Sequence, residues 1–162
     1  MAKLTTFRCF IALATARGWP PHQLDINNAF LYGFIDEEVY MLPPEGYTSA
    51  LPGQVCKLQR SVYGLKQASR QWNIELTKFL VSKGFKQSKS DYSLFTKRVN
   101  GLYTFIPVYV DDLLTLGDDQ SSIAAIKSDL HTTFTIKDLG LARYFLGIEL
   151  ARSSQGTFLN QS

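Results

Sequence analysis

Two adjacent aspartates separate two apolar runs in the second half of the chain, and this arrangement strongly restricts the local fold. Asp111 and Asp112 lie between the apolar runs 105–110 and 113–116. Short apolar runs on either side of a polar pair predict two strands joined by a tight hairpin, with the Asp pair at its tip. Because adjacent anions repel each other, the pair adds no stability by itself.

A cation bound beside Asp111 and Asp112 would remove their repulsion. Mg²⁺ suits an oxygen-rich site of this kind, because it takes few protein ligands and completes its shell with waters and substrate phosphates. The pattern therefore favours phosphoryl transfer assisted by two metal ions. The alternative is a solvated polar turn, since Asp is common in turns.

A third carboxylate, Asp25, stands at the end of a short alternating segment. Leu24 and Ile26 flank it, which predicts a strand end. The residues after it predict a helical turn that Gly33 closes. The free backbone N–H groups of this turn could hold a phosphate. The alternative for Asp25 is a helix N-cap.

Apolar periodicity and turn residues predict a mixed α+β fold. They place helices over 5–17, 68–83 and 121–134, and strands over 23–26, 39–42, 55–58, 93–98, 102–110, 141–151 and 157–159. Asn100-Gly101 is the strongest signal for a two-residue hairpin, and Gln155-Gly156 predicts a second turn. This order gives a split βαβ (ferredoxin-like) antiparallel sheet with helices on one face, and it can bring the three carboxylates to one end of the sheet.

Composition and cysteine use indicate a single soluble domain inside the cell. The chain has 162 residues, of which 45% are hydrophobic and 13% aromatic, enough for one core. We expect no membrane span, because no run of about 18 apolar residues occurs, and no secretion, because the N-terminus lacks a signal-peptide layout. Cys9 and Cys56 have no partner spacing for zinc or a disulfide, which suits a reduced compartment.

The charge is mildly basic, with a formal net charge of +3. Basic residues are frequent in the middle of the chain, with three aromatic residues among them: Lys57, Arg60, Tyr63, Lys66, Arg70, Trp72, Lys78, Lys83, Lys86, Lys89, Tyr92, Lys97 and Arg98. Cations that neutralise phosphates, combined with rings that stack on bases, are typical of nucleic-acid binding. The alternative is a solvated helix face.

Four segments together resemble one family. They are Gln23-Leu24-Asp25 continuing to Asn28-Ala29-Phe30-Leu31; Tyr63-Gly64-Leu65-Lys66-Gln67-Ala68; Tyr109-Val110-Asp111-Asp112; and Lys137-Asp138-Leu139-Gly140 continuing to Tyr144-Phe145-Leu146-Gly147-Ile148-Glu149. In this order they resemble the reverse transcriptase of copia-type LTR retrotransposons, which is part of a Pol polyprotein. The resemblance covers nearly the whole chain and implies a polymerase palm.

The resemblance implies a catalytic site with two Mg²⁺ ions, for which Mn²⁺ is a possible substitute. Asp25 and Asp111 would hold the two ions, with Asp112 supporting them and the Ile26 carbonyl as an additional ligand. Lys137 matches a lysine that could protonate the leaving pyrophosphate. The alternative for Lys137 is an ordinary solvated residue near a strand.

The resemblance also implies residues that contact nucleotide and primer. The backbone N–H groups of Asn28 and Ala29 would meet the triphosphate, and Phe30 would exclude a ribonucleotide 2′-hydroxyl. Lys66 and Gln67 match the segment along the incoming nucleotide and template, and Leu146 and Gly147 match the turn that grips the primer. Phe30 could instead be a core residue, and Gln67 could cap the helix that follows.

Several features depart from the family. Its basic fingers segment would precede Met1, and its thumb and RNase H regions would follow Ser162. Asn27 stands where the family often has Lys. Pro107 lies inside a predicted strand, where it cannot donate a ladder hydrogen bond. We therefore expect residues 1–162 to be a truncated, palm-centred reverse transcriptase domain.

The expected function is RNA-directed DNA synthesis from dNTPs on an RNA or DNA template-primer, together with the remainder of the Pol polyprotein. The expected location is the cytoplasm, within virus-like particles, or the nucleus. One alternative is a catalytically inactive nucleic-acid-binding remnant. Another is a palm-like nucleotide cyclase, in which the segment 63–68 and the turn at Leu146 and Gly147 would have no role.

Overall fold

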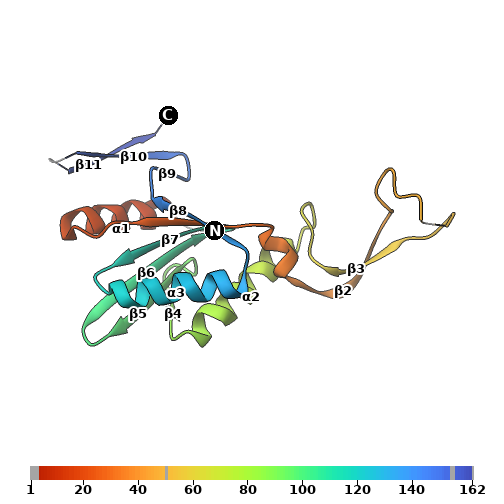
Figure 1. Cartoon of the computed structure of the whole chain (residues 1–162), viewed down its shortest axis with the longest axis horizontal. Helices are drawn as coiled ribbons and strands as arrows, with labels where there is room; N and C mark the ends of the chain where they lie inside the picture. Colours follow the sequence, from red (N-terminus) through yellow and green to blue (C-terminus); the bar gives the residue numbers. More distant parts are fainter. Residues whose placement is uncertain (1–3, 50, 154–155, 162) are drawn as a thin grey trace. The chain divides into compact units, whose positions relative to one another are not determined.

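A computed structural model of the protein describes residues 4–49, 51–153 and 156–161 (Figure 1). Its internal contacts divide the chain into two compact units. The first comprises Met1–Asn27 and Thr77–Ser162, and the second comprises Asn28–Leu76. The single domain expected over residues 1–162 stays a prediction.

The first unit is built on a six-stranded antiparallel sheet with the order β4-β5-β6-β7-β1-β8. Its strands are β1 (His22–Ile26), β4 (Lys86–Gln87), β5 (Leu94–Val99), β6 (Leu102–Tyr109), β7 (Asp112–Gly117) and β8 (Ile136–Leu141). Although β1 comes first in the chain, it lies between β7 and β8. Strands distant in sequence are therefore neighbours in the sheet.

Helices α1 (Leu4–Arg17) and α3 (Gln120–Thr133) belong to this unit. Asp119 is the N-cap of α3, and its side chain accepts a hydrogen bond of 2.9 Å from the backbone N–H of Ser122. This contact satisfies one of the donors that a helix start leaves unpaired. The apolar periodicity that predicted a helix over 121–134 corresponds to a buried stripe of Ile123, Ile126 and Leu130.

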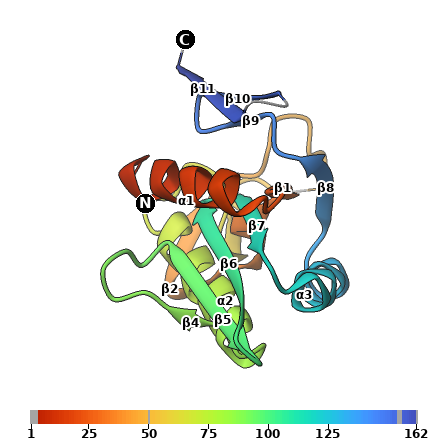
Figure 2. The same cartoon turned by 90° about the vertical axis from the view of Figure 1, so that its left-hand side faces the viewer.

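The two helices lie on opposite sides of the sheet, as Figures 1 and 2 both show. Side chains alternate along β7, so Leu114 and Leu116 point to one face and Leu113 to the other. All three are completely buried. The expectation of helices on one face is therefore wrong for α1: a strand that is apolar on both faces needs cover on both.

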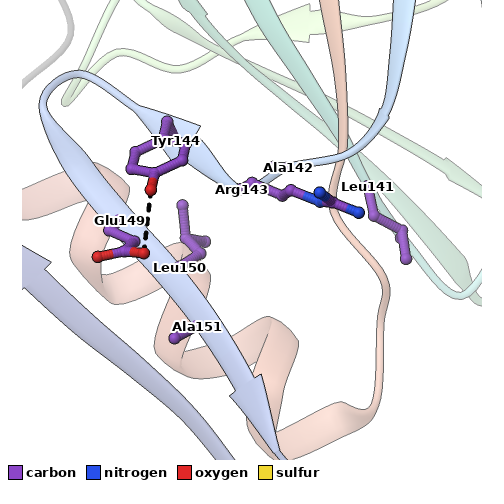
Figure 3. Close-up of a pocket in the computed structure, with 7 residues that line it drawn as sticks. All are labelled: Leu141, Ala142, Arg143, Tyr144, Glu149, Leu150 and Ala151. Atoms are coloured by element: carbon purple, nitrogen blue, oxygen red, sulfur yellow. Dashed lines mark hydrogen bonds between the residues drawn. The ribbon is translucent and has the colours of Figure 1, made fainter.

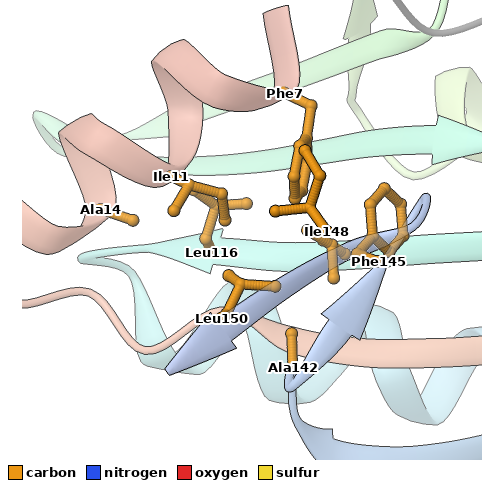
Figure 4. Close-up of a cluster of buried hydrophobic side chains, with 9 residues drawn as sticks. Phe7, Ile11, Ala14, Leu116, Ala142, Phe145, Ile148 and Leu150 are labelled. Atoms are coloured by element: carbon orange, nitrogen blue, oxygen red, sulfur yellow. The ribbon is translucent and has the colours of Figure 1, made fainter. Parts of the chain in front are cut away.

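The cover on the α1 side is a cluster of buried residues (Figure 4). Its members come from α1, β7 and the segment after β8: Phe7, Ile11, Ala14, Leu114, Leu116, Ala142, Phe145, Ile148 and Leu150. The rings of Phe7 and Phe145 stack with centroids 4.8 Å apart. This cluster attaches the C-terminal strands to α1.

Those strands are β9 (Tyr144–Phe145), β10 (Ile148–Ser153) and β11 (Gly156–Gln161), which form a separate three-stranded sheet. The continuous strand expected over 141–151 is therefore wrong. Leu146 and Gly147 both have positive φ angles, 53° and 73°, and make a turn that reverses the chain. Gln155, in the second turn predicted, lies outside the described residues.

Both predicted hairpins in the main sheet form. Val99 pairs with Leu102 across Asn100-Gly101, and Tyr109 pairs with Asp112. The tip of the second hairpin is thus Val110 and Asp111, while Asp112 already begins β7, so the tip expected at Asp111-Asp112 is displaced by one residue. Val110 has a φ of 55°, an uncommon conformation for a β-branched residue.

Pro107 occupies the interior of β6, between β5 and β7. The N–H of Val108 donates to the Ser93 carbonyl on the β5 side at 2.8 Å. Successive backbone N–H groups alternate sides, so the nitrogen of Pro107 faces β7. The β6–β7 pairing runs through Phe105 and resumes at Val108, and the ladder opens between them. The strand tolerates Pro107 because the missing donor falls at this opening.

The second unit contains η1 (Ala29–Tyr32), β2 (Phe34–Met41), β3 (Cys56–Arg60) and the first part of α2 (Ala68–Ser82). Strands β2 and β3 form an antiparallel ribbon. Gly33 permits close approach to α2, because a Cβ there would lie 2.9 Å from Cβ of Gln71. The strand predicted over 39–42 is confirmed and begins earlier, at Phe34.

Gly117 gives a test of the first unit's packing. A Cβ at this position would lie 2.0 Å from the Tyr103 carbonyl oxygen, and its φ is 147°. We expect Gly117→Ala to lower the free energy of unfolding by about 2–4 kcal/mol, measured by urea denaturation. The control is Gly101→Ala, whose φ is 87° with no atom within 4 Å. It should lose only about 1–2 kcal/mol, and equal losses in both variants would contradict the steric argument.

Candidate active site

Asp25 and Asp112 are direct partners at one end of the main sheet. The antiparallel register of β1 and β7 places Asp25 opposite Asp112. Directly paired residues point to the same face, with Cβ atoms about 4.5–5.5 Å apart. Both side chains are partly buried. The fold thus brings together two carboxylates that are 87 positions apart in the sequence, from position 25 to position 112.

Asp111 lies at the same end of the sheet, in the turn between β6 and β7. Its backbone carbonyl accepts a hydrogen bond of 2.9 Å from the N–H of Ile26. This bond attaches the hairpin tip to the end of β1. All three aspartates thus lie at one end of the sheet, but the sheet partner of Asp25 is Asp112 rather than Asp111. Convergence of the three carboxylate groups stays a prediction. Coordination by the Ile26 carbonyl stays a prediction.

Lys137 lies directly opposite Asp25 on the other side, in β8. One row across the sheet therefore reads Lys137, Asp25, Asp112. The Lys137 side chain is exposed. The sequence identified this lysine only by resemblance, whereas the register places it directly beside Asp25 in the sheet. Its role in proton transfer stays a prediction.

Burial raises the pKa of Asp112 above its ordinary value, and repulsion from Asp111 and Asp25 adds to the effect. A hydrogen bond from Gln23 acts in the opposite direction. The amide Nε2 of Gln23 donates to Oδ1 of Asp112 at 3.1 Å. Sequence reasoning missed Gln23 as a site residue, although its position two residues before Asp25 puts both on one face of β1.

The carboxylate pair has the donor chemistry for Mg²⁺. Over residues 4–49, 51–153 and 156–161, no three His, Cys, Asp or Glu side chains are grouped closely enough to hold a metal ion. Mg²⁺ in phosphoryl-transfer sites needs only one or two carboxylates, because waters and substrate phosphates fill its other positions. Asp25 and Asp112 provide that share, and a cation would remove the repulsion on Asp112.

Three residues predicted to bind nucleotide lie at the start of the second unit. Asn28 has a φ of 53° and its carbonyl accepts from the N–H of Leu31 at 2.9 Å, which begins η1. Ala29 is completely buried. Phe30 is partly buried, and its ring lies 4.5 Å from that of Tyr63, centroid to centroid. Phe30 is therefore not a fully buried core residue, and its role as a gate stays a prediction.

Lys66 and Gln67 lie in the same unit, just before α2. Lys66 is exposed, and the Gln67 carbonyl accepts from the N–H of Gln71 at 3.0 Å. Gln67 thus stands directly before α2, and the capping alternative stays a prediction. It also lines a small cavity of about 180 Å³ together with Asp36, Glu37, Arg70, Gln71 and Ile74. Contacts of either residue with nucleotide or template stay predictions.

The predicted primer-grip residues, Leu146 and Gly147, form the turn between β9 and β10 in the first unit. Leu146 packs against the α1 cluster. Beside this hairpin lies an open cavity of about 440 Å³, lined by residues 141–144 and 149–151 (Figure 3). At its wall the Tyr144 hydroxyl donates to Oε1 of Glu149 at 3.0 Å, and this bond raises the pKa of Tyr144.

Within the described parts of the chain, no helix has the length and apolar character needed to cross a membrane.

The electrostatics of Asp112 predict a pH-dependent stability. A carboxyl group whose pKa is higher in the folded state than in the unfolded state stabilises the fold at low pH, where the group is protonated. This stabilisation is lost as the pH rises through the pKa of the folded state. We expect Asp112→Asn to be more stable than the wild type at about pH 7, with the difference shrinking toward about pH 4, in metal-free urea denaturation.

Asp119 is the control of opposite sign. The N–H and hydroxyl of Ser122 and the hydroxyl of Ser121 hold the pKa of Asp119 below its ordinary value. Its contribution is present above the ordinary value and lost as pH falls. Asp119→Asn should therefore be less stable than the wild type at about pH 7. Losses of the same sign in both variants would contradict the assignment for Asp112.

Comparison with known proteins identifies relatives along the whole chain. The reverse transcriptase (RNA-dependent DNA polymerase) family matches residues 1–162. The chain is 42% identical over 160 residues to the retrovirus-related Pol polyprotein from transposon RE1 of Arabidopsis thaliana, covering 98% of this chain and 11% of that protein. It is 39% identical over 165 residues to the corresponding polyprotein from transposon TNT 1-94 of Nicotiana tabacum, covering 99% and 12%.

A more distant relative is a putative transposon Ty5-1 protein of Saccharomyces cerevisiae, 33% identical over 134 residues, which covers 82% of this chain and 44% of that protein. No solved structure matches the chain. The chain spans only 11% and 12% of the lengths of the two plant polyproteins. The agreement between the family match and the aspartates at one end of the sheet leads to one conclusion: this chain belongs to the reverse transcriptase family.

Proposed function

We propose that the chain acts as the palm of an RNA-directed DNA polymerase. In this role it transfers nucleotides from dNTPs to a primer 3′-hydroxyl with the help of two Mg²⁺ ions. The observation that carries the proposal is the pairing of Asp25 with Asp112, with Asp111 hydrogen-bonded to the end of the same strand. Family membership supports the reaction type.

The topology supports a palm-like, split βαβ arrangement. Strands β8, β1, β7 and β6 are neighbours in that order and all pairs are antiparallel. In the sequence, α2 lies between β1 and β6, and α3 lies between β7 and β8. This is the order of a ferredoxin-like βαββαβ unit. It puts the ends of β1 and β7 side by side, where the acidic pair is located.

The residues at this end of the sheet have separate roles in the proposed reaction. Asp25, Asp111 and Asp112 would hold the cations, with the Ile26 carbonyl as a further oxygen ligand. Bound Mg²⁺ would supply the Lewis acid that activates the primer hydroxyl and offsets the charge of the triphosphate. Lys137, opposite Asp25, is the proposed proton donor to the leaving pyrophosphate.

The nucleotide and primer contacts follow from the other matched residues. Asn28 and Ala29 would present backbone N–H groups to the triphosphate, and Phe30 would lie against the sugar. The exposure of Lys66 leaves its ammonium group available to a phosphate. The β9–β10 turn at Leu146 and Gly147 would hold the primer end. The proposed macromolecular partners are the template-primer and the rest of a Pol polyprotein, since the plant relatives are Pol polyproteins.

A second candidate function is nucleic-acid binding without catalysis. The guanidinium of Arg60 lies 3.8 Å from the ring centroid of Phe34, and Lys57 lies 6.0 Å from that of Tyr40. Phe34 and Tyr40 are 51% and 52% exposed, so these cation–aromatic pairs face solvent on the β2–β3 ribbon. Such surfaces suit single-stranded nucleic acid. This candidate predicts binding that is unaffected by changes at Asp25 or Asp112.

Primer extension separates the two functions. The 162-residue chain, and the same chain within a longer Pol protein, are assayed with template-primer, dNTPs and Mg²⁺ or Mn²⁺. We expect activity in the longer protein and a loss of at least about 100-fold in Asp25→Asn and Asp112→Asn, because each removes a charge-stabilising ligand. Asp129→Asn, on the surface beside Lys83, should retain activity. Template binding without extension in every form would favour the second candidate.

Phe30 provides a test of sugar selection. If its ring blocks the 2′-hydroxyl, Phe30→Ala in the active protein should increase the use of ribonucleotides relative to dNTPs by about 10- to 100-fold, the range available from a steric pocket. The matched control is Phe34→Ala, which removes an exposed ring from the same unit. Ribonucleotide discrimination that is unchanged in Phe30→Ala would place the gate elsewhere.

A further inference from the structure

Gln23 makes a contact inside the acidic site that the proposed mechanism does not use. Its amide Nε2 donates to Oδ1 of Asp112 at 3.1 Å. The geometry points to a positioning role: Gln23 holds the Asp112 carboxylate in one orientation, so that Oδ2 is the oxygen left for a divalent cation shared with Asp25. This inference rests on the proposed function.

The sheet explains why Gln23 can reach Asp112. In the β1–β7 register Gln23 lies opposite Leu114, and Asp25 lies opposite Asp112. Gln23 and Asp112 are therefore diagonal neighbours on the same face, a separation that a long side chain spans.

The backbone of Gln23 is held on both sides. It pairs with Leu114 of β7 and with Gly140 of β8, because β1 has a neighbouring strand on each side. The next residue, Leu24, is completely buried in the core. A donor on such a strand has a defined position, and a site built on strands is more precise than one built on loops.

A neutral amide is the donor that this position requires. Ionised Asp accepts hydrogen bonds only, so the NH₂ group of Gln23 faces Oδ1. A lysine here would neutralise Asp112 and compete with the cation, and a glutamate would add a fourth anion beside Asp25, Asp111 and Asp112. The amide fixes the direction of the carboxylate and leaves its charge in place. Without this hydrogen bond, a binding cation would have to order the Asp112 side chain, and the entropic cost would lower its affinity.

The proposal is tested by metal affinity, which requires no catalysis. Mn²⁺ binding to the full chain is measured by electron paramagnetic resonance, and Mg²⁺ binding by competition. Gln23→Met keeps the length and removes the donor. We expect it to weaken Mn²⁺ binding by about 10- to 100-fold, the usual effect of removing a hydrogen bond to a metal ligand. Its metal-free melting temperature should stay close to that of the wild type.

A second variant, Gln23→Asn, keeps an amide on a side chain that is one methylene shorter. It should bind Mn²⁺ as weakly as Gln23→Met, because its donor no longer reaches Asp112. This variant carries the test if Gln23→Met does not fold. The matched control is Gln71→Met, which removes the same kind of bond, Gln71 Nε2 to Asp36 Oδ2 at 3.1 Å, in the second unit. It should leave the affinity unchanged.

The double variant Gln23→Met with Asp112→Asn separates a positioning role from a general one. If Gln23 acts through Asp112, the double variant should bind Mn²⁺ no more weakly than Asp112→Asn alone. Additive losses, or wild-type affinity in both Gln23 variants, would overturn the inference. Failure of the proposed function would look different: the wild-type chain itself would not bind Mn²⁺, or Asp25→Asn and Asp112→Asn would bind it as well as the wild type.

Discussion

The position of β1 between β7 and β8 is the constraint on which the rest of the site depends. Because β1 has hydrogen-bonded neighbours on both edges, its residues are held in two registers at once. One register brings Asp112 beside Asp25, and the other brings Lys137. The N–H of Ile26 then attaches the hairpin tip through the Asp111 carbonyl. Three segments distant in sequence thereby deliver their charged groups to one end of one sheet.

This arrangement holds like charges together at a cost in stability. Burial and two neighbouring carboxylates raise the pKa of Asp112, so the metal-free fold carries unfavourable electrostatics at neutral pH. The strained φ of Val110, at 55°, lies in the same turn. The apolar contacts that offset these costs lie further along the same strands, where Leu113, Leu114 and Leu116 are completely buried between α1 and α3. The buried leucines along β7 thus offset the unfavourable electrostatics at the Asp112 end of the strand.

Helices and hairpins were predicted well from the sequence where their formation depends on neighbouring residues alone. Asn100-Gly101 allows positive φ at both positions and forms the expected hairpin, and the apolar stripe of α3 is buried as its spacing indicates. The predictions that failed depended on non-local packing. The strand expected over 141–151 is interrupted at Leu146 and Gly147, because Phe145 and Ile148 on either side of the turn both pack into the cluster around α1. Periodicity alone cannot reveal this.

The sequence by itself determined the chemistry: which residues are acidic, that Asp111 and Asp112 follow an apolar run, and, through four matched segments, the family. The tertiary structure alone decided which groups meet. Whether Asp25 pairs with Asp111 or Asp112 depends on the register between β1 and β7, because positions 25 and 112 are 87 residues apart in the sequence. A one-residue slip of β7 would move each of its side chains to the other face of the sheet. The contact of Gln23 with Asp112 has the same origin. Neighbours across a sheet are set by which apolar faces can be buried together, and no local pattern in the chain contains that information.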